Sequence, residues 1–239
     1  RIPVINAGDG GHQHPTQTLT DLMTIRRRMG RLDDLTIGLC GDLKYGRTVH
    51  SLLHFLERFH NVQVYLIAPD ALKLPDYMIS FLKEHNMPYC EVNSIDEVLP
   101  ELDVLYMTRI QRERFTSAQE YENLEGSYQL TAEKMKRAKK DMLVLHPLPR
   151  VDEIAQDVDD DPRAVYFRQA RFGMFGRMAL LLTLSKLPFE RAGHQDIGHE
   201  PGVRCSNHKC ITRTELYVPL HGKIGDRCPY CDKLLELDI

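Results

Sequence analysis

The feature that most constrains the fold is an alternation of strand-like and helix-like segments between about residues 34 and 146. Short apolar runs alternate with stretches in which apolar residues recur every three to four positions, as in amphipathic helices. The predicted strands are 35–40, 62–67, 103–107 and 142–145, and the predicted helices among them are 45–59 and 75–85. This order predicts βαβ units and an α/β fold, with a doubly wound parallel sheet covered on both faces.

Two more helices are predicted outside this alternation. Residues 15–28 begin with a proline and carry an apolar stripe, and residues 175–184 are strongly apolar. Residues 189–203 shift to glycine, histidine and glutamate without periodicity, which predicts a linker. The chain therefore divides into a larger unit and a small C-terminal one.

Composition agrees with this division and excludes some functions. The chain has 239 residues and 42% hydrophobic content, enough for one sizeable core and a small satellite. A net charge of −3 does not favour a nucleic-acid partner. No apolar run approaches the ~20 residues of a membrane span. The start, Arg1-Ile2-Pro3, carries neither methionine nor a signal-peptide pattern, and we interpret it as the middle of a longer chain.

Four of the six cysteines crowd into residues 205–239 as two close pairs, Cys205 with Cys210 and Cys228 with Cys231. Four thiolates in this spacing predict a tetrahedral structural Zn²⁺ site that supplies much of the folding energy of so small a unit. Two disulfides are the alternative. They are disfavoured because a reducing cytoplasm with one metal site explains the uneven distribution of cysteines better than a disulfide framework does. His208 is expected on the surface. Acidic residues offset the basic ones here, which favours a protein contact over nucleic acid.

In open parallel sheets, ligands bind at the loops that follow the carboxyl ends of the strands. These loops are residues 41–47, 108–114 and 146–153. The first reads Gly-Asp-Leu-Lys-Tyr-Gly-Arg-Thr and departs from a nucleotide-phosphate loop at Arg47, where lysine is usual. A guanidinium suits a carboxylate better than the space between phosphates. A solvated residue at a helix start remains the plain alternative, although a cation there is disfavoured without an anionic ligand.

Four motifs carry a family resemblance, and they occur in family order. Residues 9–17 resemble the His-Pro-x-Gln element of carbamoyltransferases, while residues 41–51, 108–114 and 146–153 resemble elements of aspartate carbamoyltransferases. The resemblance covers roughly residues 1–187. The tail resembles the zinc domain of the regulatory chain of the bacterial enzymes, joined here to the catalytic sequence without the nucleotide-effector domain.

The resemblance implies transfer of a carbamoyl group from carbamoyl phosphate to the amine of L-aspartate, in pyrimidine biosynthesis. Arg47 would hold one carboxylate of aspartate and Arg109 the other, with Gln111 beside it. Main-chain carbonyls of Pro147 and Leu148 would orient the amine, and the prolines would stiffen that loop. The ornithine enzymes usually carry a cysteine where this chain has Pro147, so aspartate is favoured.

On the carbamoyl side, the resemblance makes His14 the group that donates a hydrogen bond to the carbonyl oxygen as negative charge develops. Gln17, one helical turn later, would contact the carbamoyl nitrogen. Lys44, Tyr45 and Glu120 correspond to residues that exchange contacts on domain closure, with solvated surface groups as the default. We interpret His50 as structural and His146 as support for its loop.

The family's Ser-Thr-Arg-Thr phosphate loop does not occur in this sequence, nor do the serine and lysine that a neighbouring subunit donates. We therefore expect the isolated chain to be inactive, and the active sites to be composite in a homotrimer or higher oligomer. We expect residues 1–14 to be the end of a carbamoyl-phosphate domain and residues 15–170 to form an aspartate-binding α/β domain. Residues 171–188 are expected to form a helix that returns to the missing N-terminal domain. Residues 189–203 would be a linker and residues 204–239 the zinc domain. A non-catalytic regulatory or scaffold relative, and a nucleotide binder, are the alternatives.

Overall fold

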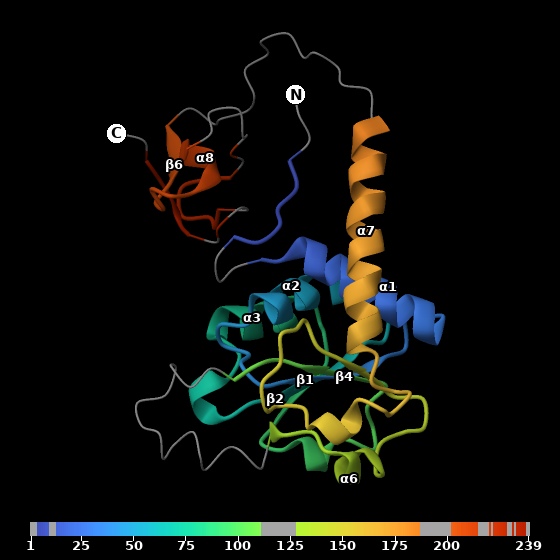
Figure 1. Ribbon diagram of the computed structural model, residues 1–239. Coiled ribbons are helices and arrows are strands. Elements are labelled where there is room, and N and C mark those ends of the chain that lie inside the picture. The colour runs from blue at the N-terminus through green and yellow to red at the C-terminus, as the bar shows by residue number, and fades with distance from the viewer. Residues whose placement is uncertain are drawn as a thin grey trace.

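The computed structural model describes residues 4–9, 13–110, 128–186, 202–214, 220, 222–228, 231 and 233–237. Its centre is a five-stranded parallel sheet in the order β3-β2-β1-β4-β5 (Figure 1). The strands are β1 (Thr36–Cys40), β2 (Gln63–Ile67), β3 (Tyr89–Val92), β4 (Val104–Met107) and β5 (Leu143–Leu145). The predicted α/β class with a parallel sheet is confirmed.

The sequence pattern did not predict β3, which is the edge strand beside β2. Its burial explains the omission, because none of its four residues is fully buried and Cys90 and Glu91 are exposed. A half-solvated edge strand lacks the continuous apolar run that marks the central strands.

Helices cover both faces of the sheet, as a doubly wound fold requires. The upper layer in Figure 1 holds α1 (Pro15–Met29), α2 (Arg47–Leu56) and α3 (Asp76–Glu84). Its core combines apolar residues of these helices with alternate strand residues such as Leu39 and Val64. The opposite face packs shorter elements against the other strand residues, including Ile67 and Met107. These elements are η2 (Ile95–Glu97), α6 (Ala132–Met135) and η4 (Gln156–Val158), while η1 (Asp70–Leu72) follows β2.

The long helix α7 (Tyr166–Lys186) begins earlier than the predicted 175, which corrects the sequence interpretation. Its first turns mix arginines and glutamine with buried Gly173 and Gly176, so apolar periodicity is weak there. A Cβ on Gly173 would lie 2.9 Å from Thr20 Oγ1, and one on Gly176 would lie 2.8 Å from Met23 Sδ. The glycines therefore allow α7 to pack closely on α1.

The second half of α7 extends beyond α1 (Figure 1). Its large apolar side chains are mostly exposed in this structure, namely Met174, Phe175, Met178, Leu181 and Leu182. Among the described residues, no helix combines the length and apolar character that crossing a membrane requires.

The C-terminal unit is small. Its described elements are β6 (Val203–Cys205), α8 (Ile211–Thr214) and β7 (Leu235–Leu237), and the two strands pair antiparallel. Most of the predicted linker, 189–203, lies outside the described residues.

Candidate functional site

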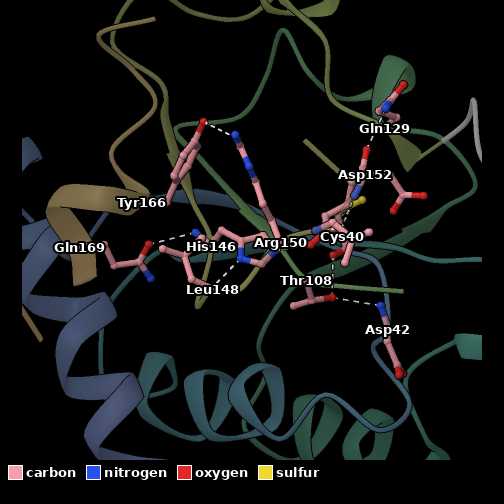
Figure 2. Close-up of polar contacts among 12 residues, drawn as sticks. Cys40, Asp42, Thr108, Gln129, His146, Leu148, Arg150, Asp152, Tyr166 and Gln169 are labelled. Carbon is pink, nitrogen blue, oxygen red and sulfur yellow. Dashed lines mark hydrogen bonds and ion pairs between the residues drawn. The ribbon is translucent and has the colours of Figure 1, made fainter. Parts of the chain in front are cut away.

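Two of the predicted ligand loops are joined at the carboxyl ends of β1 and β4. The Thr108 hydroxyl donates to the Cys40 carbonyl at 2.9 Å and accepts the Asp42 backbone N–H at 3.0 Å (Figure 2). Gly41 turns between them with φ +114°, and a Cβ there would lie 2.4 Å from the Thr108 carbonyl oxygen. Only glycine fits this approach, so the starts of the two loops are held together.

The first loop leads into α2 and presents Arg47 at the first residue of that helix. The Asp42 carboxylate accepts the Tyr45 N–H at 2.9 Å, which places an anionic group where a phosphate loop needs free donors. A Cβ on Gly8 would lie 3.0 Å from Arg47 Nη1, so the segment 4–9 runs directly beside the guanidinium. This geometry argues against a nucleotide loop and brings Arg47 next to the residues that precede α1.

His14 lies at the N-cap of α1, followed by Pro15 at the first helical position. Burial, followed by the positive charges of Arg47 and Arg177, lowers the pKa of His14, and Asp9 opposes them. A neutral imidazole can still donate one hydrogen bond. Among the described residues the buried Nδ1 of His14 has no hydrogen-bond partner, so its hydrogen-bonding capacity is not used within the described part of the chain.

Gln17 is buried one turn further along α1, and its Nε2 donates to Asp21 Oδ1 at 2.8 Å. The bond orients the amide and leaves its oxygen for another donor, such as an N–H₂ group of a ligand. His14 and Gln17 therefore lie on neighbouring turns at the same end of α1.

The third loop follows β5 and is organised around His146, which is 2% exposed. Its Nδ1 accepts the Leu148 N–H at 2.8 Å (Figure 2), so Nε2 carries the proton and donates to Glu153 Oε1 at 2.6 Å. Leu148 has φ +56°, a conformation that a branched side chain rarely adopts. The histidine bond holds that conformation and fixes the carbonyls of Pro147 and Leu148. The interpretation of His146 as a loop support is confirmed.

Contacts of Glu153 and Arg150 hold the rest of this loop. Burial raises the pKa of Glu153, but the hydrogen bonds from His146 and from the Val151 N–H outweigh it and leave the pKa below its ordinary value. Arg150 binds Asp159 through both terminal nitrogens at 2.5 Å. It also donates to the Tyr166 hydroxyl at 3.0 Å (Figure 2). The loop is therefore tied to η4 and to the start of α7.

The remaining predicted residues have different outcomes. Arg109 is exposed immediately after β4, whereas Gln111 and Glu120 lie outside the described residues. Lys44 and Tyr45 are both exposed, and the Lys44 ammonium lies 5.4 Å from the Tyr45 ring centroid.

The sequence interpretation missed Arg177 on α7 and left His50 as a core residue. Arg177 is half-buried, and its charge acts on both His14 and Asp21. A single arginine in a helix carries no motif, so nothing in the pattern singled it out. His50 is buried with Nε2 2.8 Å from the Leu43 carbonyl oxygen, which confirms its structural interpretation.

The four tail cysteines converge. Their Sγ atoms all lie within 4.8 Å of one another, with Cys205 and Cys231 3.3 Å apart and Cys210 and Cys228 3.6 Å apart. These separations exclude disulfides in this structure and approach the roughly 3.8 Å edge of a tetrahedron with Zn–S bonds of about 2.3 Å. The cluster is therefore a candidate metal site. His208 is exposed, as expected.

Residues 33–184 match the family described as aspartate/ornithine carbamoyltransferase, Asp/Orn binding domain, and residues 1–27 match its carbamoyl-P binding domain. This chain therefore belongs to the aspartate/ornithine carbamoyltransferase family. It is 60% identical over 184 residues to the aspartate carbamoyltransferase catalytic subunit of Lachnoclostridium phytofermentans, and 62% identical over 180 residues to that of Clostridium novyi. These matches cover 77% and 75% of this chain, and 60% and 59% of the relatives.

Solved structures give the same family and fold. The catalytic subunit of aspartate transcarbamoylase from M. jannaschii matches with a TM-score of 0.73 and 51% identity, over 77% of this chain and 60% of that one. The Trypanosoma cruzi enzyme in complex with carbamoyl phosphate and aspartate matches with a TM-score of 0.70 and 43% identity, over 78% and 59%. The chain thus spans about 60% of the length of the relatives it matches.

Proposed function

We propose that this chain provides the aspartate-binding side of an aspartate carbamoyltransferase. The reaction transfers the carbamoyl group of carbamoyl phosphate to the amine of L-aspartate, giving N-carbamoyl-L-aspartate and phosphate for pyrimidine biosynthesis. The observation that carries the proposal is that Arg47 lies close enough for its charge to lower the pKa of His14, beside two loops held by hydrogen bonds at the carboxyl edge of the sheet. The relatives at about 60% identity are named as catalytic subunits of this enzyme.

His14 is the proposed electrophilic group. The amine nitrogen forms a bond to the carbamoyl carbon while negative charge grows on the carbonyl oxygen. The bond from carbon to the phosphate oxygen then breaks, and the departing phosphate takes the proton that the amine nitrogen releases. A neutral imidazole donating to that oxygen stabilises the tetrahedral intermediate, and one such donor typically contributes about 2.7–4 kcal/mol. The lowered pKa of His14 suits this role, because the ring stays neutral near physiological pH.

Aspartate binding needs two cations at fixed positions, because a bidentate guanidinium pair orients each carboxylate. Arg47 and Arg109 are the proposed pair, with Gln111 beside Arg109. The carbonyls of Pro147 and Leu148 accept hydrogen bonds from the attacking amine, and their loop is held by His146. An aspartate held this way approaches the carbamoyl carbon in a reactive orientation.

A complete site also needs groups that bind the phosphate of carbamoyl phosphate, and the sequence of this chain shows no such motif. The exposed apolar side chains of α7, including Phe175 and Leu182, are the proposed contact with a carbamoyl-phosphate-binding domain. Active sites that combine groups from neighbouring subunits then imply a homotrimer or a higher oligomer in the cytoplasm.

The cysteine cluster is proposed to hold a structural Zn²⁺. Four thiolates complete a tetrahedral shell and leave no position for substrate, so the metal would stabilise the tail and take no part in catalysis. The tail is the part that resembles a regulatory-chain zinc domain.

The test is a carbamoyl-aspartate assay on the full-length product of the gene. Arg109→Ala should raise the KM for aspartate and lower kcat/KM by on the order of 100-fold, because one carboxylate loses its partner. Arg58→Ala, which removes another exposed arginine, is the matched control and should leave both constants within about twofold. An inactive wild type would favour the alternative, a non-catalytic regulatory or scaffold relative.

A further inference from the structure

A buried carboxylate lies behind the candidate site, and among the described residues no cation forms an ion pair with it. Asp21 of α1 is fully buried and accepts three hydrogen bonds. Gln17 Nε2 and Gln169 Nε2 donate to Oδ1 at 2.8 and 2.6 Å, and the Tyr106 hydroxyl donates to Oδ2 at 3.0 Å. The donors come from α1, α7 and β4, so one carboxylate joins three elements that are far apart in sequence.

Gln169 extends these contacts toward the third loop. Its Oε1 accepts the His146 backbone N–H at 2.9 Å (Figure 2), while its Nε2 donates to Asp21. The side chain is 1% exposed, so neither bond competes with bulk water. His146 in turn sets the conformation of Leu148 through Nδ1. A chain of hydrogen bonds therefore links Gln17 to Leu148 through Asp21, Gln169 and the body of His146, and all but the last of these bonds are buried.

The two ends of this chain belong to opposite sides of the proposed reaction. Gln17 is the proposed contact for the carbamoyl nitrogen, and Leu148 supplies a carbonyl for the aspartate amine. We propose that Asp21 and Gln169 are positioning residues that hold the carbamoyl side and the aspartate side of the site at one fixed separation. The inference rests on the proposed function, because it assigns what each end binds.

Packing alone does not require these polar groups. The glycines of α7 already bring the helix against α1, and an apolar pair of the same volume would avoid the cost of burying a carboxylate. Burial raises the pKa of Asp21 to about 7, although three donors and the nearby charge of Arg177 act to lower it. A group retained at such a cost is better explained by the geometry that it imposes.

Substitutions at Gln169 and at Asp21 are expected to have different kinetic effects. Gln169→Leu removes the acceptor of the His146 N–H but keeps the bond between Gln17 and Asp21. The KM for aspartate should rise and kcat/KM for aspartate should fall on the order of 100-fold, while the KM for carbamoyl phosphate stays within about threefold. Asp21→Leu releases Gln17 and Gln169 together, so both KM values should rise.

Two further variants control for stability. Asp21→Asn keeps an acceptor for both glutamines and should restore most of the carbamoyl-phosphate affinity that Asp21→Leu loses. Thr24→Ala removes a buried hydroxyl that donates to the Thr20 carbonyl on the same helix, outside the chain from Gln17 to Leu148. It should lower Tm and leave both KM values unchanged.

The measurement is steady-state kinetics at 25 °C with both substrates varied, together with Tm, on the full-length product of the gene. Lower Tm with both KM values unchanged in the leucine variants would overturn the inference and leave a purely structural role. If the leucine variants do not fold, Gln169→Asn decides, because it keeps the amide but shortens the side chain by one methylene: a severalfold rise in the KM for aspartate supports positioning, and unchanged constants overturn it. An inactive wild type would instead overturn the proposed function itself.

Discussion

The α/β unit and the cysteine tail reach stability by different routes. The α/β unit has two extensive apolar clusters, one on each face of the sheet. The buried apolar group of the tail consists largely of the cysteines themselves, with Leu220 and Leu235. Apolar burial can hold the first unit, whereas the described part of the second has so small a core that the proposed metal would supply much of its stability. The difference teaches that one chain can combine a unit held by packing with a tail that we propose is held by coordination.

The largest effect is expected from removing the metal proposed for the tail. Cys210→Ser, or treatment with a strong chelator, should unfold residues 202–237 and leave the sheet folded, because metal binding in such units supplies on the order of 10 kcal/mol. Limited proteolysis and zinc analysis provide the measurement. Cys90→Ser changes an exposed cysteine outside the cluster and is the control. If the tail resists protease equally with and without metal, its stability does not depend on a metal, and the proposed difference between the two units is wrong.

The next effect concerns the apolar core. Leu52 on α2 is fully buried, so Leu52→Ala should lower the free energy of unfolding of the α/β unit by about 2–5 kcal/mol through lost burial and a cavity. Leu234→Ala makes the same change at a tail residue that is 55% exposed and should cost much less. Urea unfolding followed by circular dichroism measures both, with zinc content expected to stay constant. Equal losses in the two variants would contradict the assigned burial.

Asp21 gives the α/β unit a pH dependence. The folded pKa of about 7 lies above the ordinary 3.8, so between these values the folded protein keeps a proton that the unfolded chain has released. The free energy of unfolding should therefore fall as pH rises through this window, by about 2 kcal/mol between pH 5 and 7, and then level off. Asp21→Asn should remove this part of the slope in urea titrations. An unchanged slope in the variant would exclude Asp21 as its source.

The smallest expected effect distinguishes a glycine that a neighbouring atom requires from a glycine that only its backbone conformation requires. Gly41 and Gly30 both have positive φ, +114° and +77°. A Cβ on Gly41 would meet the Thr108 carbonyl, whereas one on Gly30 would meet nothing within 4 Å. Gly41→Ala should cost about 1–3 kcal/mol and also displace the loop before Arg47, raising the KM for aspartate. Gly30→Ala should cost about 1 kcal/mol and leave KM unchanged. Thermal unfolding and kinetics on the full-length product test the pair.

The sequence by itself determined the fold class and most of the central strands, because apolar runs bounded by turn residues mark buried parallel strands locally. The sequence also showed that the four tail cysteines form two closely spaced pairs of candidate ligands, Cys205 with Cys210 and Cys228 with Cys231, because metal-ligand spacing is a local property. The arrangement that places His14 before Pro15, and Arg47 at the start of a helix, follows from the same local signals.

Only the tertiary structure decided which residues behind the site act together. Asp21 and Gln169 are separated by 148 positions, and neither belongs to a short motif. The positive φ of Leu148 depends on His146, which is held in turn by Glu153. Local propensity describes each segment alone, whereas these contacts arise when the sheet brings the loops after β1, β4 and β5 to one edge. The energetic requirement to satisfy every polar group that becomes buried there then selects the partners.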